Sequence, residues 1–220
     1  MSLWTLYSFF YNALNELVPY KEQIGLIHSK FEEEVSLFHK VFIDAGCGTG
    51  NLLKNRRNVV GVDMSENMLR VGQDKSPESF LILSDLNQRL PFKDGVFDGG
   101  WSNNVIAYVK DPKKTIMELH RVLKPGATFV LATLRPTFNP LAILLDHIKR
   151  SCWLSTIKYF FLIPIILLLN IPIVVKLRTG IYHGFEMDTL KQLFEASGFV
   201  VKQCCLSYSD QDVFIVATRG

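Results

Sequence analysis

The residues best suited to chemistry lie where apolar runs of the chain end in an acid or a glycine. Residues 41–43 are followed by Asp44 and by three glycines at alternate positions, Gly46, Gly48 and Gly50. A short β-branched run closed by glycine is typical of a buried parallel strand. Glycines let the backbone turn tightly and approach a bound molecule, because a Cβ would collide with one or the other. The pattern predicts a ligand-binding loop after the strand.

A second acid, Asp63, ends the next apolar run at 59–62. A carboxylate at a strand tip can accept both hydroxyls of a ribose, which indicates a nucleoside cofactor. The loop reads GxGxG rather than GxGxxG, and Asp63 follows it sooner than the usual spacing of about 20 residues, which argues against a nicotinamide dinucleotide. We expect a short helix to begin near Gly50 and to occupy 51–57.

Polar residues also follow the next two predicted strands, at 80–83 and 96–101. Asp85 follows the first of them, and Asn103 and Asn104 follow the second. The carboxyl ends of parallel strands face the ligand crevice of an open α/β sheet. These side chains are therefore candidates for contact with a cofactor or a substrate, although Asp85 could instead be a simple turn acid.

Several motifs in this order resemble the class I S-adenosylmethionine (SAM) dependent methyltransferases of type 11. The resemblance covers residues 40–134 and 185–218. It implies SAM as cofactor and one α/β domain over 1–220, with a Rossmann-like seven-stranded sheet. That sheet would be mostly parallel with an antiparallel last strand, with helices on both faces and an apolar helical insert. The motifs that carry the resemblance are 44–50, 61–69, 84–86, 90–92, 97–98 and 118–127.

The resemblance also implies which residues hold the cofactor. Met64 stands where relatives place an apolar residue against adenine, and it could instead be a core methionine. The Asp85 carboxylate would accept the exocyclic amine of adenine while the Leu86 backbone meets the ring edge. Methyl transfer from SAM requires no metal, so we expect none. The full set of expected cofactor residues is Asp44, Gly46, Cys47, Gly48, Gly50, Asp63, Met64, Asp85, Leu86, Asn103, Asn104 and Tyr11.

The sequence does not identify a catalytic base. Many relatives carry histidine in the stretch that corresponds to 105–109, whereas Ala107 and Tyr108 stand here. Tyr108 and His183 are the candidates that we carry forward, and a structural role is an alternative for His183. Tyr182 and His147 are the other titratable groups expected near the cavity mouth.

Residues 1–39 are expected to form a helical lid, with one helix over 3–20 that ends at Pro19 and a second over 21–38. In relatives an N-terminal helix closes over the cofactor and places an aromatic ring near its methionine part. Tyr11 or Tyr20 could take that place. The alternative is a helix that only packs over the sheet.

Residues 136–184 form an insert that is strongly apolar between 153 and 178. A single membrane crossing there would leave strands of one sheet on opposite sides of the bilayer, and prolines at 164 and 172 interrupt the run. We therefore expect an interfacial or buried segment. Its basic and aromatic flanks favour peripheral membrane contact through 153–178, whereas a substrate cap or a subunit interface in an oligomer are the alternatives. The flanking residues are Lys149, Arg150, Trp153, Lys158, Tyr159, Lys176 and Arg178.

The bulk composition excludes little except nucleic-acid binding. The chain carries 24 Lys and Arg against 21 Asp and Glu, so its net charge of +3 gives no concentrated basic face. Its four cysteines show no zinc-binding spacing, which indicates a reducing setting. The first residues lack the pattern of a secretory signal. We expect a cytoplasmic protein that lies peripherally on the membrane.

The leading functional hypothesis is methyl transfer to a small lipophilic acceptor at a membrane surface. A quinone, a sterol, an isoprenoid or a phospholipid headgroup would fit an apolar wall beside the cofactor. Two alternatives stay open. One is a soluble small-molecule methyltransferase whose insert caps a hydrophobic pocket, and the other is a non-catalytic SAM-binding interaction protein.

Overall fold

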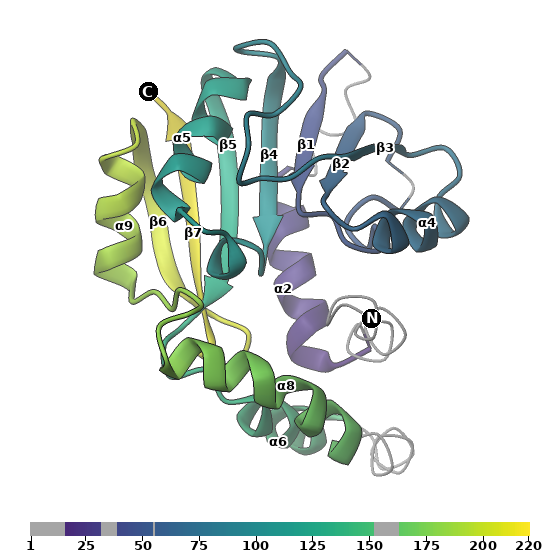
Figure 1. The fold of residues 1–220 in the computed structure, drawn as a ribbon, viewed down its shortest axis with the longest axis vertical. Helices are drawn as coiled ribbons and strands as arrows, with labels where there is room; N and C mark the ends of the chain where they lie inside the picture. The colour runs from purple at the N-terminus through teal and green to yellow at the C-terminus, as the bar shows by residue number, and fades with distance from the viewer. Residues whose placement is uncertain (1–15, 32–38, 55, 152–162) are drawn as a thin grey trace.

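A computed structural model describes residues 16–31, 39–54, 56–151 and 163–220. Its centre is a seven-stranded sheet with helices on both faces, and a pair of helices lies beyond one end of that sheet (Figure 1). Tyr11, together with most of the predicted helix over 3–20, lies outside the described residues.

The strands lie side by side in the order β3-β2-β1-β4-β5-β7-β6. β7 is antiparallel to both β5 and β6, and the other neighbouring pairs are parallel. The chain order reverses between β1 and β4, where an open α/β sheet binds its ligands. The predicted Rossmann-like sheet is confirmed. Its strands are β1 (Phe42–Ala45), β2 (Val59–Asp63), β3 (Phe80–Leu83), β4 (Phe97–Asn103), β5 (Leu123–Leu134), β6 (Phe199–Ser207) and β7 (Asp212–Arg219).

Helices cover both faces of the sheet because alternate strand residues point to opposite sides. Ile43 of β1 packs in a cluster with α5 and α9, whereas its neighbour Phe42 packs with Phe31, just beyond α2. α2 ends at Ser29, short of the predicted end at 38. The described helices are α2 (Val18–Ser29), α4 (Glu66–Lys75), α5 (Pro112–Val122), α6 (Pro140–Arg150), α8 (Ile163–Arg178) and α9 (Met187–Glu195), with a 3-10 turn η1 (Ile106–Tyr108).

A third hydrophobic cluster joins the insert to α2 at the end of the sheet. α6 and α8 form the layer drawn below the sheet in Figure 1, and α6 packs against α2 as well as α8. Leu134 at the end of β5, Leu17 before α2, Ile143 of α6 and Ile173 of α8 are buried together. No helix in the described parts of the chain is long and apolar enough to cross a membrane.

The helix predicted after the glycine loop is replaced by successive turns in the residues that the structure describes there. The Gly50 N–H donates to the Cys47 carbonyl at 2.9 Å, and the Leu53 N–H donates to the Gly50 carbonyl at 3.0 Å. Each bond spans three residues, rather than the four of an α-helix. Few residues separate the loop from β2, and the first turn of a helix is costly to form. The prediction of a short helix was wrong.

Prolines lie inside three of the described elements. Pro19 lies in the first turn of α2, where proline is tolerated because its missing N–H would have no helical partner. Pro172 lies within α8. Pro125 lies within β5, whose register against β4 shifts between Phe97 and Gly99. Pro19 therefore lies at the start of a described helix rather than at the end of one, and Pro172 does not end α8.

Candidate functional site

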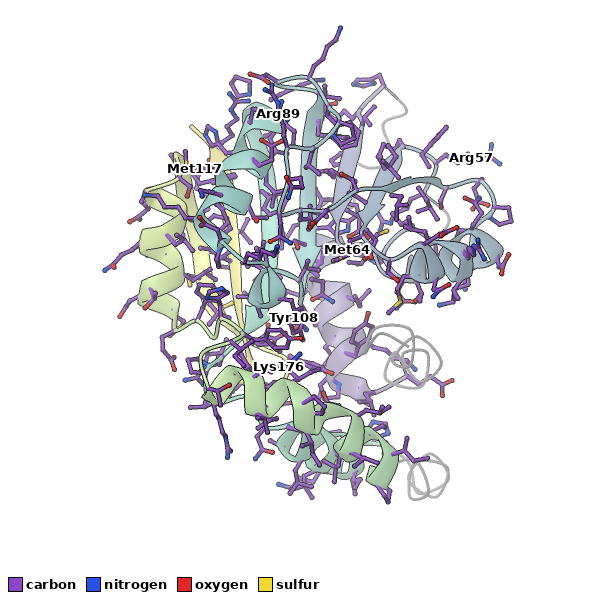
Figure 2. All side chains as sticks on the ribbon, in the orientation of Figure 1. Arg57, Met64, Arg89, Tyr108, Met117 and Lys176 are labelled. Carbon is purple, nitrogen blue, oxygen red and sulfur yellow. The ribbon has the colours of Figure 1, made fainter. Side chains whose placement is uncertain are left out.

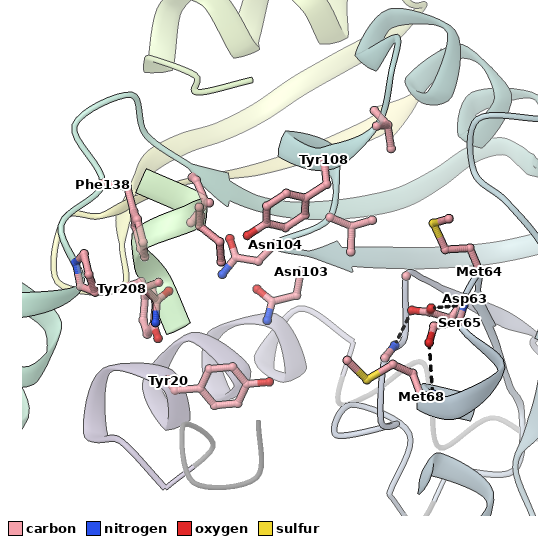
Figure 3. Close-up of a pocket in the computed structure, with 18 of the residues that line it drawn as sticks. Tyr20, Asp63, Met64, Ser65, Met68, Asn103, Asn104, Tyr108, Phe138 and Tyr208 are labelled. Atoms are coloured by element: carbon pink, nitrogen blue, oxygen red, sulfur yellow. Dashed lines mark hydrogen bonds between the residues drawn. The ribbon is translucent and has the colours of Figure 1, made fainter. Parts of the chain in front are cut away.

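A cavity opens at the carboxyl ends of the parallel strands, beside the point where the strand order reverses (Figure 3). It has a polar half, formed by the glycine loop and the ends of β2 and β4, and an apolar half, formed by the insert and α2. Eight of the twelve expected cofactor residues line it: Gly46, Gly48, Asp63, Met64, Asp85, Leu86, Asn103 and Asn104.

The glycine loop is shaped by close backbone contacts. Gly46 has a φ of +80°, and a Cβ added there would lie 2.2 Å from Cγ2 of Val105. Its N–H donates to the Val62 carbonyl at 2.7 Å. Glycine is therefore required where the loop leaves β1, because a side chain would both strain the backbone and collide with the segment after β4.

Asp63 ties the end of β2 to this loop. Its Oδ2 accepts a hydrogen bond from the Gly48 N–H at 2.9 Å, and its Oδ1 accepts one from the Ser65 N–H at 2.8 Å. Burial raises the pKa of Asp63, and these hydrogen bonds lower it. Ser65 caps α4 by accepting a hydrogen bond from the Met68 N–H at 3.4 Å. Met64 is 61% exposed and lines the cavity, so it is not the core methionine of the alternative interpretation.

Asp44, Cys47 and Gly50 do not line the cavity. Burial raises the pKa of Asp44 to about 7, although the nearby Trp101 indole lowers it, and the buried Oδ2 has no hydrogen-bond partner among the described residues. The Cys47 thiol lies against Gly61 in the core, and burial raises its pKa. These three residues shape the loop from behind, and direct contact with a cofactor stays a prediction.

The turn after β3 places two expected residues on the cavity wall. Oδ1 of Asp85 accepts hydrogen bonds from the backbone and the side chain of Asn87, at 2.9 and 2.7 Å. The Leu86 carbonyl accepts one from the Thr115 hydroxyl at 3.1 Å. Asp85 therefore serves as a turn acid and also faces the cavity, so the two interpretations of this residue are compatible.

The end of β4 belongs to a buried polar network that sequence reasoning missed. The Gln23 side-chain N–H₂ group donates to Oδ1 of Asn103 at 2.7 Å and to Oδ2 of Asp212 at 2.8 Å. The Ser207 hydroxyl donates to Oε1 of Gln23 at 3.0 Å. Burial raises the pKa of Asp212 to about 7, while Gln23 and Asn104 lower it. The available signal was an acid at the head of the otherwise apolar run 213–217.

The two candidates for a base, Tyr108 and His183, and the two other titratable groups expected near the cavity mouth, Tyr182 and His147, differ in position. Tyr108 lines the cavity, and its ring meets the Tyr182 ring edge-on at 4.9 Å between centroids. Figure 2 shows Tyr108 between Met64 and the insert residue Lys176. The other three do not line the cavity. The His183 N–H donates to the Ala107 carbonyl, and the His147 ring accepts from the Val18 N–H at 3.2 Å.

The apolar half of the cavity comes from elements with no motif. Phe138, Ile143, Ile166 and Ile173 contribute the insert's part of the wall. Tyr20 of α2 closes the opposite side, facing Asn103 and Tyr108 in Figure 3. α2 and Tyr20 belong to the segment that was predicted to form a lid, and the lid role stays a prediction.

Three similarities to known proteins bear on this site. A family model of the type 11 methyltransferase domain matches residues 43–131. Demethylmenaquinone methyltransferase of Symbiobacterium thermophilum is 30% identical over 218 residues, covering 86% of this chain and 80% of that protein. Malonyl-[acyl-carrier protein] O-methyltransferase of Buchnera aphidicola is 35% identical over 114 residues, covering 50% of this chain and 44% of that protein, so the chain matches less than half of that relative.

The fold has a solved counterpart in magnesium protoporphyrin IX methyltransferase from Synechocystis with bound S-adenosylhomocysteine. Its TM-score is 0.62 at 16% identity, with 92% of this chain and 84% of that chain covered.

Together, the reversed strand order, the glycine cradle and the strand-end acid define an α/β protein that binds a nucleoside cofactor. The cradle fits such a cofactor because Gly46 admits no side chain and Asp63 presents a carboxylate to the cavity. The chain belongs to the class I SAM-dependent methyltransferases of type 11, and its cofactor is SAM.

Proposed function

We propose that this chain transfers the methyl group of SAM to a small lipophilic acceptor at a membrane surface. The observation that carries the proposal is the division of one cavity into a polar half at the strand ends and an apolar half made by the insert. The demethylmenaquinone named for the relative with high coverage is likewise lipophilic. A quinone, a sterol, an isoprenoid or a phospholipid headgroup remains within the proposed class.

The chain's own residues bind, orient and exclude water. SAM supplies a methyl group that is already activated on a sulfonium, so the protein mainly has to hold the reactants in line. Gly46, Gly48 and Asp63 would hold the nucleoside part, and Ile166 and Ile173 would hold the apolar part of the acceptor. Tyr20, which is buried and accepts a hydrogen bond from the Asn51 side chain at 3.3 Å, helps to keep water out.

Membrane contact is proposed through the outer face of α8. Ile166 and Ile173 point inward, whereas Leu168 and Ile171 are 66% and 53% exposed. An exposed apolar stripe of this kind inserts into the headgroup layer of a bilayer. One helix would then face both the lipid and the cavity, which gives a lipophilic acceptor a short path between them.

Charges beside this stripe favour an anionic bilayer as the occupant. Lys149 at the end of α6 and Arg178 at the end of α8 are both exposed, and juxtamembrane basic residues attract anionic headgroups. Arg150 forms ion pairs with Glu22 and Asp146 and is engaged within the protein. Residues 153–162 of the proposed contact lie outside the described residues.

The test of activity uses purified protein, methyl-labelled SAM and a total membrane extract. We expect protein-dependent label in the organic phase, and its mass spectrum identifies the acceptor. Label that appears only in the aqueous phase would indicate a soluble acceptor. SAM binding without any transferred label would indicate a non-catalytic protein.

The test of membrane contact is cosedimentation with vesicles that mix phosphatidylcholine and phosphatidylserine. The variant Leu168→Glu/Ile171→Glu should lose vesicle binding, because both charges would have to enter the apolar layer. Met117→Glu is the matched control, since Met117 is 51% exposed on α5, well away from α8 (Figure 2). Undiminished binding by the double variant would overturn the assignment. A wild-type dimer that the double variant dissociates would make this face a subunit interface instead.

A further inference from the structure

A polar group without a partner lies at the boundary between the two halves of the cavity. Asn104 lines the cavity, and its Oδ1 is buried without a hydrogen-bond partner among the described residues. The backbone of Asn104 is left-handed, with a φ of +56°, and its N–H donates to the Ala132 carbonyl at 2.8 Å. In Figure 3 the Asn104 amide and the Tyr108 hydroxyl point toward the same part of the cavity. A buried acceptor left unpaired costs free energy, which a donor on a bound molecule would recover.

The segment that carries this amide is held by the buried network around Gln23. Gln23 is 1% exposed and reaches from α2 to Asn103 at the end of β4 and to Asp212 at the head of β7. Asp212 is fully buried, and the neighbouring Asn104 side chain lowers its pKa. Two elements far apart in sequence therefore fix the end of β4, directly before the left-handed residue.

Burying the polar side chains of this network costs free energy, which indicates that the network positions a functional residue. A buried carboxyl and a buried carboxamide are tolerated only when hydrogen bonds satisfy them. Gln23 uses its side-chain nitrogen on two partners and its oxygen on Ser207, so its amide is almost completely engaged. Two oxygens of this cluster, Oδ1 of Asn104 and Oδ1 of Asp212, have no hydrogen-bond partner among the described residues. Of these two residues, only Asn104 lines the cavity.

We propose that Asn104 binds a hydroxyl donor on the polar end of the lipophilic acceptor, and that Gln23 and Asp212 are positioning residues for it. This rests on the proposed function and narrows its substrate class. The acceptor has an apolar body, which packs against α6 and α8, and a hydroxyl at the end that faces the cofactor half. A lipophile without such a hydroxyl leaves the Asn104 oxygen unpaired and therefore binds with lower affinity.

The test measures binding, so it does not depend on turnover. The protein is saturated with S-adenosylhomocysteine, which fills the cofactor half, and titrated with 2-naphthol and with naphthalene as hydroxyl-bearing and hydroxyl-free probes. We expect the wild type to prefer 2-naphthol by about tenfold, the value of one hydrogen bond to a buried acceptor. Asn104→Gly suits the left-handed backbone and removes the amide, so it should abolish the preference when the variant is measured at a saturating concentration of S-adenosylhomocysteine.

An Asn104→Gly variant that keeps the tenfold preference would overturn the assignment, as would a wild type with no preference. The activity assay with membrane extract is separate. If no label is transferred but 2-naphthol is still preferred, the proposed acceptor chemistry is wrong and the hydroxyl site stands. If label is transferred but 2-naphthol is not preferred, only the hydroxyl site is wrong.

The positioning role is tested with Gln23→Leu against the exposed control Gln192→Leu on α9. Gln23→Leu should reduce the preference for 2-naphthol, and the control should leave it intact. A purely structural Gln23 would lower the melting temperature without changing the preference, which would overturn this part. Asp212→Asn keeps the side-chain shape and provides the second variant if Gln23→Leu yields too little folded protein.

Discussion

The two halves of the cavity are built in opposite ways. The cofactor half uses backbone: Gly46 leaves room for the chain, and the Gly48 N–H is fixed by Asp63. The apolar half uses side chains on helices, such as Ile166 and Ile173 of α8, which pack with the end of β5. A backbone site depends on specific residue types at fixed spacing, whereas an apolar wall accepts many side chains of similar volume. The first half therefore leaves a motif in the sequence, and the second does not.

The largest expected effect is a pH dependence of the free energy of unfolding. It comes from two buried carboxyls, Asp44 beside one half of the cavity and Asp212 beside the other. Burial raises the pKa of each to about 7. Each protonated carboxyl therefore contributes stability that is complete below its unfolded pKa of about 3.9 and is lost as the pH rises through 7. By this linkage each of the two carboxyls lowers the free energy of unfolding by about 4 kcal/mol as the pH rises from 4 to 8.

Histidines act in the opposite direction over this range, because burial lowers the pKa of His28 to about 4 and also lowers that of His147. The measurement is therefore a difference between denaturant titrations of wild type and Asp212→Asn at each pH. The difference should change by about 4 kcal/mol across the window. A difference that is constant with pH would show that Asp212 is ionised throughout.

The next effect concerns the glycine cradle. Gly46→Ala should lower the free energy of unfolding by about 3 kcal/mol, since the new Cβ meets Val105 in a left-handed backbone. Chemical denaturation measures the loss. Gly46→Ala/Val105→Ala should recover only the part due to collision with the two Val105 methyl groups, because the backbone strain and the close approach to Cβ of residue 105 remain. Full recovery would show that the φ value contributes nothing.

Asp63→Ala should weaken SAM binding by about 100-fold, because it removes a buried carboxylate from the cavity and frees the Gly48 N–H. Calorimetric titration with SAM measures the change. Asp74→Ala, at an exposed position of α4, is the control and should bind normally. Vesicle binding should be the same in both variants, because it depends on the other half. A loss of vesicle binding in Asp63→Ala would mean that the two halves are coupled.

The sequence predicted the parts of this molecule that follow from strand ends and glycine spacing. The seven-stranded sheet with an antiparallel last strand followed from the family resemblance, and eight of the twelve expected cofactor residues line the cavity. Gln23 and Asp212 were missed because they are 189 residues apart, and neither is unusual until the fold brings them together. Pro172 interrupts the apolar run of the sequence, yet α8 continues through it, because the packing of the helix outweighs the propensity of proline to end one.

The smallest expected effect compares the two faces of α8. It tests whether the inner face contacts the acceptor and the outer face contacts the lipid independently of each other. Ile173 is 2% exposed and Ile171 is 53% exposed, although both are isoleucines two residues apart on the same helix. Ile173→Ala should cost about 2 kcal/mol in the free energy of unfolding, at the low end for such a change because the side chain borders an existing cavity. Ile171→Ala should cost less than about 0.5 kcal/mol. Ile173→Ala should also weaken naphthalene binding, and Ile171→Ala should weaken vesicle binding instead. If both substitutions changed both kinds of binding, the inner and outer faces of α8 would act as one surface, and the acceptor would be held between the protein and the lipid.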